Sequence, residues 1–472
     1  MHSENKGNAL AKTRREKDSL GIKNVPADAY YGVETVRALE NFPITGLRFH
    51  PDLIWALAQI KKACARSNME LRRLDRRRGL AIVKACDEII AGKWLNQFPS
   101  DVLQSGAGVS IHMNMNEVVA NRALTILGRK RGDYEYLHSH DHVNMGQSTN
   151  DVIPTAIRLA ALKLAERFTF SSGRLEKVLR RKSGEFRKVV KAGRTHMQDA
   201  APVTLGQEFG GWARQFEKAS ARVHLLCRDL QELGIGGSAV GTGLNTTLSY
   251  RSAVIRYLRS QTGFPVKSAR NLFEVMQSDA DMAAVSAGLR NYAIVLIQVS
   301  GDLRLLSSGP KTGFAEILLP ARQPGSSIMP GKINPVMPET AQQTGYQVFG
   351  HDLAIAQAAA GGQLELNVMR PVIAHNLLQA FEALSNVSEV LAKYCIEGIK
   401  ANRERCLRYA EESYGIAAAL NPSIGYSRAA ECVKKSMATG KTLREVVLEE
   451  KLLSPAELNR ILSPENLTKP KR

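Results

Sequence analysis

The sequence predicts a mainly α protein with a bundle of long helices at its centre. Three segments repeat apolar residues at intervals of three and four, the spacing of one helix face. They run from Phe209 to Leu230, from Met282 to Leu306 and from Ile373 to Tyr394. The region around them shows neither alternating strands and helices nor a phosphate-binding glycine motif. We therefore expect helices packed at about 20° to one another, as in helical bundles.

The second of these helices is expected to lie inside the bundle. From Met282 to Leu306 it would span about 37 Å at about 1.5 Å per residue. Residues 295–299 read VLIQV and are apolar on more than one face. Helices of this kind suggest that several subunits share one bundle core.

Composition limits the class of protein. A chain of 472 residues with 44% hydrophobic content can bury a large core in two or three domains. It has no stretch of eighteen apolar residues, and residues 1–18 lack the apolar core of a secretory signal. The six cysteines are scattered without CxxC or metal-ligand spacing. We expect free thiols, a cytoplasmic protein, no membrane span and no bound metal.

The chain is strongly basic, with 64 Lys and Arg against 45 Asp and Glu and a net charge of +19. A positive field steers small dianions, and it also attracts nucleic acid. The densest run, LRRLDRRRG at 71–79, has no interleaved aromatics and no reader-domain motif. We interpret it as a solvated basic face and do not expect nucleic acid binding.

Residues 1–148 are expected to form a first, mixed domain. Helices are predicted at Asp52–Leu74 and Gly79–Gly92, and another from Asn114. The stretch Ser105–Ala123 contains two glycines ahead of the start of this helix, and the residues there are either a helix cap or a carboxylate site.

Residues 149–405 are expected to form the central long-helix domain. At its start Ser148, Thr149 and Asn150 precede a helix opened by Pro154, as a capping cluster or the wall of an anion pocket. Further along, Thr195 and His196 lie in a polar loop. His196 is either structural or a carboxylate ligand whose tautomer another carboxylate fixes.

Residues 406–472 are expected to form a small helical domain. SPAE at Ser454 places a glutamate three residues after a serine, which predicts a capping box. We find no catalytic constellation in this segment.

The segment Gln323–Glu339, QPGSSIMPGKINPVMPE, holds four prolines and two glycines, which exclude a regular helix or strand across it. It is either a mobile lid that carries chemistry to a substrate or an interhelical loop whose polar residues cap helices. Its reactive or hydrogen-bonding side chains are Ser326, Ser327, Lys332, Asn334 and Glu339.

The stretch Gly325–Pro335, GSSIMPGKINP, resembles the signature loop of the aspartase/fumarase superfamily. The resemblance extends from about Glu16 to Pro470. In detail the chain is most similar to the aspartase (aspartate ammonia-lyase) branch, through NPVMPE after the signature, DLRLLSSGP at 302–310 and GQLELNVMRPVI at 362–373.

This resemblance implies a cofactor-free lyase that reversibly converts L-aspartate to fumarate and ammonium. Ser326 would be the general base that removes the Cβ proton, giving an aci-carboxylate intermediate. Ser327 would contact the side-chain carboxylate, and Lys332 and Asn334 would hold the substrate and stabilise the loop oxyanion.

The resemblance also assigns the other polar segments. Residues 148–150 match the second substrate-binding segment, and Thr195 and His196 match the third, with Glu339 behind His196. In the family these segments come from different subunits. The resemblance therefore implies a homotetramer with a twenty-helix core and a three-domain subunit.

The chain departs from the family pattern at four positions. Val109 stands where many relatives have a carboxylate-binding threonine, and His112 replaces an asparagine in the same loop. Gly301 replaces an asparagine, and Ala360 a glutamate. Two alternatives therefore stay open: a class II fumarase acting on malate, and a catalytically weakened paralogue that works as a binding protein.

Overall fold

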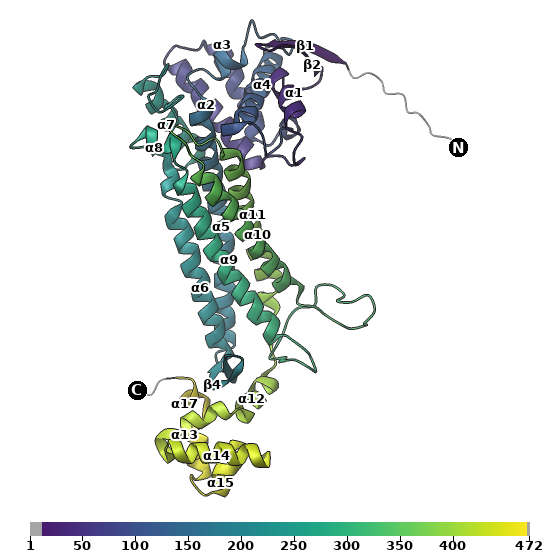
Figure 1. Ribbon diagram of the computed structural model, residues 1–472, viewed down its shortest axis with the longest axis vertical. Helices are drawn as coiled ribbons and strands as arrows, with labels where there is room; N and C mark the ends of the chain where they lie inside the picture. The colour runs from purple at the N-terminus through teal and green to yellow at the C-terminus, as the bar shows by residue number, and fades with distance from the viewer. Residues whose placement is uncertain (1–11, 470–472) are drawn as a thin grey trace, which may run out of the picture. The chain divides into compact units, whose positions relative to one another are not determined.

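The computed structural model describes residues 12–469 and confirms the mainly α fold (Figure 1). These residues divide into two compact units. Unit 1 comprises the chain up to Phe168 together with Arg222–Arg290 and Gln347–Ala383. Unit 2 comprises Thr169–Ala221, Asn291–Tyr346 and the chain from Leu384 onward. The division into domains 1–148, 149–405 and 406–472 stays a prediction.

Unit 1 begins with an antiparallel hairpin of β1 and β2, in which Thr13 pairs with Pro26 and Asp18 with Gly21. Helices follow, two of them close to their predicted positions. The bounds are β1 Thr13–Asp18, β2 Gly21–Pro26, α1 Val33–Asn41, α2 Pro51–Glu70, α3 Arg76–Ile90, α4 Val109–Ile126, α7 Leu248–Thr262 and α8 Leu272–Gln277.

The predicted start of α4 at Asn114 was wrong, because the helix begins at Val109. Ala107 and Gly108 adopt left-handed backbone conformations, with φ of 59° and 87°. The helix begins directly after these two residues. The glycines therefore form only the turn that directly precedes the helix.

The long helices predicted from apolar spacing are confirmed as α6, α9 and α11, and α5 and α10 are also long. Their bounds are α5 Thr149–Glu185, α6 Leu205–Leu226, α9 Ala280–Leu306, α10 Val336–Ala360 and α11 Arg370–Tyr394. Pro154 lies inside α5 and leaves the Asn150 carbonyl without its helical donor. The buried Arg370 guanidinium donates to that carbonyl at 3.2 Å, so the helix continues.

Segments of these helices pack side by side within each unit (Figure 1). In unit 1 the rings of Phe168 and Phe381 meet edge to face at 6.1 Å. In unit 2 Phe216 lies 5.3 Å from Tyr292, whose hydroxyl is 2.8 Å from the Ser388 hydroxyl. The predicted bundle core is therefore present in the helical part of both units.

Unit 2 contains the β3–β4 hairpin and the carboxyl-terminal helices, which enclose a small core of their own around Leu420, Val446 and Leu458. The capping box predicted at Ser454 is confirmed. The bounds are β3 Val190–Thr195, β4 Gln198–Thr204, β7 Ile317–Leu318, β8 Lys400–Ala401, α12 Arg403–Glu412, α13 Ala417–Ile424, α14 Tyr426–Thr439, α15 Leu443–Glu449, α16 Pro455–Ile461 and α17 Pro464–Leu467.

All six cysteines are free and buried, as expected. Among residues 12–469, α9 is the helix long and apolar enough to cross a membrane, and half of its most apolar stretch is buried in the protein. Core helices meet the same criterion, so the expected absence of a membrane span stays a prediction.

Candidate active site

The signature loop connects β7 to α10 and is closed at its neck by two hydrogen bonds. The Gly325 N–H donates to the Lys332 carbonyl at 2.8 Å, and the Asn334 side-chain amide donates to the Gly325 carbonyl at 2.8 Å. A Cβ at position 325 would lie 2.4 Å from the Lys332 oxygen. Only glycine therefore permits this closure, and Asn334 holds the loop in shape.

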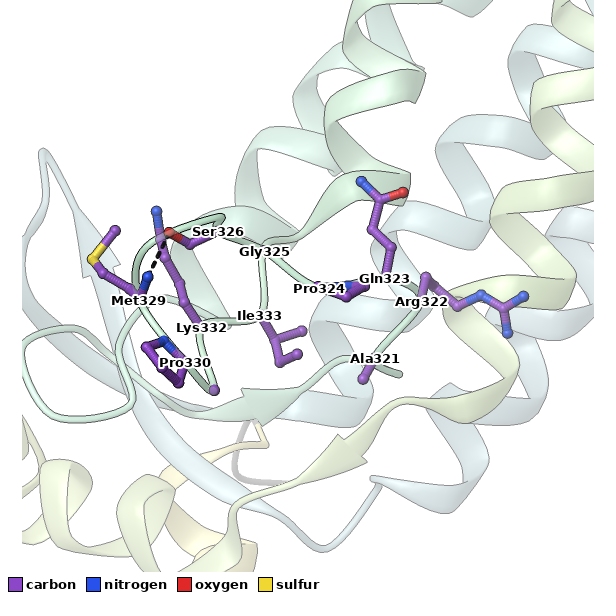
Figure 2. Close-up of a pocket in the computed structure, with 11 residues that line it drawn as sticks. Ala321, Arg322, Gln323, Pro324, Gly325, Ser326, Met329, Pro330, Lys332 and Ile333 are labelled. Atoms are coloured by element: carbon purple, nitrogen blue, oxygen red, sulfur yellow. Dashed lines mark hydrogen bonds between the residues drawn. The ribbon is translucent and has the colours of Figure 1, made fainter.

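Within the loop, Ser326 is placed by its own backbone. The Ile328 N–H donates to its Oγ at 3.2 Å. The Met329 N–H donates to the same oxygen at 3.0 Å (Figure 2). A neutral serine accepts such bonds in an ordinary turn. The same two donors also stabilise an alkoxide, because hydrogen bonds to the charged form favour ionisation. The geometry therefore suits a serine that has to lose its proton.

The loop surrounds a cavity of about 470 Å³. In the view of Figure 2 the side chains of Ser326 and Lys332 extend toward the same edge of the loop, away from Arg322 and Gln323. Ser327 and Lys332 are exposed. The guanidinium of the exposed Arg322, at the start of the loop, lies 4.4 Å from the centre of the Tyr394 ring. The cavity can therefore offer a hydroxyl and a cation to a small anion.

Thr195 and His196 lie at the tip of the β3–β4 hairpin. His196 and Met197 form its two-residue turn, with φ of 54° and 60°, and Thr195 pairs with Gln198. Positive φ at both central positions defines a type I′ turn, which usually contains glycine or asparagine. His196 is exposed at the end of the hairpin, and its positive φ is a strained conformation for a residue other than glycine.

A buried ion cluster anchors this hairpin. Arg194 reaches both oxygens of the fully buried Glu316, at 3.0 and 3.1 Å. The buried Lys191 ammonium lies 3.2 Å from Glu316 and 2.8 Å from Glu208. The base of the hairpin is thus held rigidly while its tip is exposed.

Glu339 lies in the first turn of α10 and is half-buried. Among residues 12–469 of one chain, no hydrogen bond links its carboxylate to His196. The resemblance places this pair between subunits, so the pairing stays a prediction. Ser326 and Lys332 therefore line the cavity of the signature loop, whereas Asn334 closes its neck and Ser327 is exposed. Glu339 and the hairpin residues occupy separate elements.

The Ser148–Asn150 segment belongs to unit 1 and begins α5. The Ser148 hydroxyl caps the helix by accepting from the Asn150 N–H at 3.2 Å. The Asn150 side chain donates to the Ala239 carbonyl at 2.8 Å. Thr149 is held differently, since its hydroxyl lies 2.7 Å from Nδ1 of His112. Ser148 therefore acts as a cap, while Thr149 connects to a buried polar cluster.

Asp151 ties this segment to the glycine-rich loop at 236–238. Its carboxylate accepts from the backbone N–H groups of Ser148, Gly236 and Ser238, each at 3.0 Å. Burial raises the pKa of Asp151 to about 7. Sequence reasoning missed this residue because one Asp after Asn has no distinguishing pattern.

His112, one of the departures from the family pattern, is fully buried on α4, and its Nε2 lies 2.6 Å from Nζ of the buried Lys61. Burial, and then the Lys61 charge, hold the pKa of His112 well below its usual value. Lys61 was also missed. Its neighbours one helical turn away, Leu57, Ala58, Cys64 and Ala65, are all apolar, and that spacing could have revealed a buried lysine.

The remaining departures are placed as follows. Val109 is the first residue of α4 and is 41% exposed, so it offers no hydrogen bond where a threonine would. Gly301 is half-buried within α9, and Ala360 is exposed at the end of α10. Nothing in the structure explains the choice of residue at 301 or 360.

Comparisons with known proteins agree with this fold. Residues 21–350 match the lyase family and residues 416–469 the carboxyl terminus of fumarase C. An aspartate ammonia-lyase from a Bacillus species is 47% identical over 457 residues, covering 97% of this chain and 98% of the relative. A class II fumarate hydratase from Halobacterium salinarum is 47% identical over 456 residues, covering 96% and 97%.

A solved structure agrees as well. The fumarate lyase:delta crystallin from Brucella melitensis, solved with bound cobalt, superimposes with a TM-score of 0.94 at 46% identity, covering 97% of this chain and 100% of that one. Sequence and structure agree along almost the whole length. The chain therefore belongs to the lyase family of the aspartase/fumarase superfamily.

Proposed function

We propose that this protein is an aspartate ammonia-lyase that reversibly eliminates ammonia from L-aspartate to give fumarate. Several aspartate ammonia-lyases are 43–47% identical over nearly the whole chain. The observation that carries the chemistry is the placement of Ser326, whose Oγ accepts from two backbone amides in the loop that also holds Lys332. We also propose that the reaction occurs in the cytoplasm.

The reaction requires a proton to leave the carbon next to the side-chain carboxylate. Its loss places a second negative charge on that carboxylate, so the dominant need is for donors arranged in advance. Ser326 takes the proton, and the amides of Ile328 and Met329 stabilise its alkoxide form. Lys332 and Ser327 supply the cation and hydroxyl that hold the substrate.

The remaining donors are proposed to come from neighbouring subunits of a homotetramer. Large apolar side chains stay exposed on α9 and α10, which favours burial against other copies. They include Ile294, Leu305, Tyr346, Phe349 and Leu353. In the assembled site, residues 148–150 and the tip of the β3–β4 hairpin with His196 complete the binding surface, and Glu339 orients His196.

An absorbance assay tests the proposal. Purified protein is given L-aspartate or L-malate, and fumarate formation is followed in the ultraviolet. We expect fumarate from aspartate. Fumarate from malate alone would identify a class II fumarase, the second candidate, which the 47% identity to the Halobacterium salinarum enzyme favours. No product from either substrate would contradict both and favour the binding protein.

A further inference from the structure

A buried polar cluster lies directly behind the Thr149 hydroxyl in unit 1. The Lys61 ammonium is 2.6 Å from Nε2 of His112, 3.0 Å from Oδ1 of Asn144 and 2.8 Å from Oε1 of Gln147. Nδ1 of His112 in turn lies 2.7 Å from Oγ1 of Thr149. Lys61 and His112 are both fully buried. The chain of contacts therefore links a buried cation to a residue of the proposed substrate site.

The donors and acceptors around Lys61 can be assigned one by one. The Gln147 amide nitrogen donates to the Val143 carbonyl at 2.9 Å, and that of Asn144 donates to the Gln147 carbonyl at 3.3 Å. Both side-chain oxygens therefore face Lys61. An ammonium has three donors and no acceptor. Two donors go to these oxygens, and the third goes to Nε2 of His112, which must accept.

This assignment fixes the histidine tautomer. A neutral imidazole that accepts at Nε2 carries its proton on Nδ1. His112 then donates from Nδ1 to the Thr149 oxygen. The Thr149 hydroxyl can then donate its own hydrogen bond to a different acceptor.

We propose that Lys61 and His112 are positioning residues that orient the Thr149 hydroxyl as a donor to the substrate carboxylate. This inference rests on the proposed function, because Thr149 contacts substrate only if the chain binds a dicarboxylate. It also gives a role to the departure at His112. Val109 lacks the hydroxyl that a threonine would offer, and a pre-oriented Thr149 offsets that loss.

Other titratable groups surround the pair on each neighbouring element. They are Cys64 on α2, Cys86 on α3, His140 in the turn before α5, Asp151 on α5 and Tyr250 on α7. Burial raises the pKa of both thiols and of Tyr250, so these groups stay neutral near pH 7. An ionised Asp151 favours the Lys61 ammonium, and a charged His140 disfavours charge on His112.

The arrangement makes binding depend on pH in one direction. Burial lowers the pKa of Lys61 to about 7. Above that pH the neutral amine has two donors and one lone pair. The lone pair then accepts from Nε2–H of His112, and the freed Nδ1 accepts from Thr149. The Thr149 hydroxyl then donates its hydrogen bond to His112 and no longer to the substrate carboxylate. Ionised Asp151 favours the Lys61 ammonium and already contributes to this pKa, and it does not reverse the direction.

Calorimetric titration of the full-length protein with succinate, an unreactive dicarboxylate, tests the proposal. His112→Leu and Thr149→Val are each expected to weaken succinate binding about 10- to 100-fold, the usual effect of losing a hydrogen bond to a charged group. The double variant is expected to bind no more weakly than either single variant, because both changes remove the same donor. Additive losses would overturn the proposal.

A matched pair of lysine variants tests the source of the orientation. Lys61→Met is expected to weaken succinate binding and remove its pH dependence, whereas Lys62→Met is expected to change neither. Lys62 neighbours Lys61 on α2 but pairs at 2.6 Å with Asp87. Unfolding temperatures check that each variant folds. Should Lys61→Met fail to fold, His112→Asn, which breaks the link to Lys61, is expected to abolish the pH dependence. Persistence of the pH dependence in that variant would overturn the proposal.

Solid-state NMR of protein labelled with ¹⁵N-histidine reads the tautomer without any turnover. The His112 signals are assigned from their disappearance in His112→Leu. We expect the proton on Nδ1 at pH 6 and on Nε2 at pH 8.5. A proton on Nε2 at pH 6 would overturn the inference. Failure of the unmodified protein to bind succinate would instead refute the proposed function, while the tautomer measurement still decides whether Lys61 orients His112.

Discussion

At the residue scale, the Ser326 hydroxyl gives the signature loop its proposed chemistry. A serine is a poor base unless its oxyanion is stabilised, and two backbone amides already point at this oxygen. Gly325 and Asn334 close the neck of the loop, so the turn that supplies these amides does not depend on a bound substrate. The chemistry is therefore built into the backbone of the loop.

Ser326→Ala is expected to lower kcat about 10²- to 10⁴-fold, the usual contribution of a general base. The unfolding free energy is expected to change by less than about 1 kcal/mol, because the side chain lies in a loop and buries little area. Steady-state kinetics and chemical denaturation measure the two effects. Ser327→Ala serves as the comparison and is expected to raise KM more than it lowers kcat. A Ser326→Ala enzyme with normal kcat would remove the base assignment.

The sequence predicted some functional residues and missed others. The signature loop was found because its motif is long and specific. Lys61 was missed because lysine is rarely buried, and its neighbour Lys62 does face an ordinary surface partner. The contact between His112 and Thr149 joins two separate segments of unit 1. Local sequence patterns carry no information about such long-range contacts.

At the scale of elements, α9 and α10 approach closely within unit 2 through Gly345. A Cβ at this position would lie 2.5 Å from Cγ1 of Ile297. Gly345→Ala is therefore expected to destabilise the protein by about 1–3 kcal/mol, because overpacking outweighs the gain in helix propensity. Gly211→Ala on the polar face of α6 meets no atom within 4 Å and is expected to stabilise by about 0.5–1 kcal/mol.

Denaturant unfolding of both glycine variants distinguishes the packing effect from helix propensity. Equal changes in the two variants would contradict the close approach of α9 and α10.

A second element contact joins α3 to α4 through Glu88. Arg122 donates to both Glu88 oxygens, at 2.6 and 2.8 Å, and the Trp94 ring nitrogen donates at 2.8 Å. Chiefly through Arg122, these bonds lower the pKa of Glu88 from 4.5 to about 2. Folding therefore favours the ionised form of Glu88, and the resulting stabilisation of the folded protein is fully present above about pH 4.5. It is lost as pH falls toward about 2.

Glu88→Gln is expected to cost about 1–2 kcal/mol at pH 7, the loss of charge-assisted hydrogen bonds. Urea unfolding of the parent and the variant at pH 7, 5 and 3.5 measures the difference. We expect the gap between the two proteins to narrow only at the lowest pH. A gap that stays constant down to pH 3.5 would show that the ionisation of Glu88 does not stabilise the contact.

The elements show what periodicity can and cannot predict. Apolar spacing correctly predicted α6, α9 and α11. The start of α4 was placed too late because two left-handed residues make a tight turn that the sequence presents as a glycine-rich loop. The length of α5 depends on Arg370, which satisfies the carbonyl exposed by Pro154 and lies far along the chain. The spacing of apolar residues along the sequence cannot predict such a hydrogen bond between distant residues.

At the scale of the whole molecule, the proposed site requires several copies of the chain. Light scattering is expected to give four times the chain mass of 51.8 kDa. Leu353→Asp is expected to shift the protein toward smaller species, because Leu353 is a 63% exposed leucine on α10 and a charge there opposes burial. An unmodified protein that is monomeric would contradict the shared site.

Mixed assemblies test the sharing of the site directly. Ser326→Ala and His196→Asn variants, each expected to be inactive alone, are co-expressed with different affinity tags and purified through both. If a site takes Ser326 and His196 from different chains, random mixing is expected to restore about a quarter of normal activity. Complete inactivity of well-folded mixed tetramers would place both residues in a site built by one chain.

The central claim is that the Ser326 loop removes a proton from L-aspartate. The most direct measurement is the ultraviolet trace of fumarate from L-aspartate, recorded in parallel for the purified unmodified protein and for Ser326→Ala. We predict a steady rise for the unmodified protein and an almost flat trace for the variant. A flat trace for both proteins, or an equal rise for both, would contradict the account.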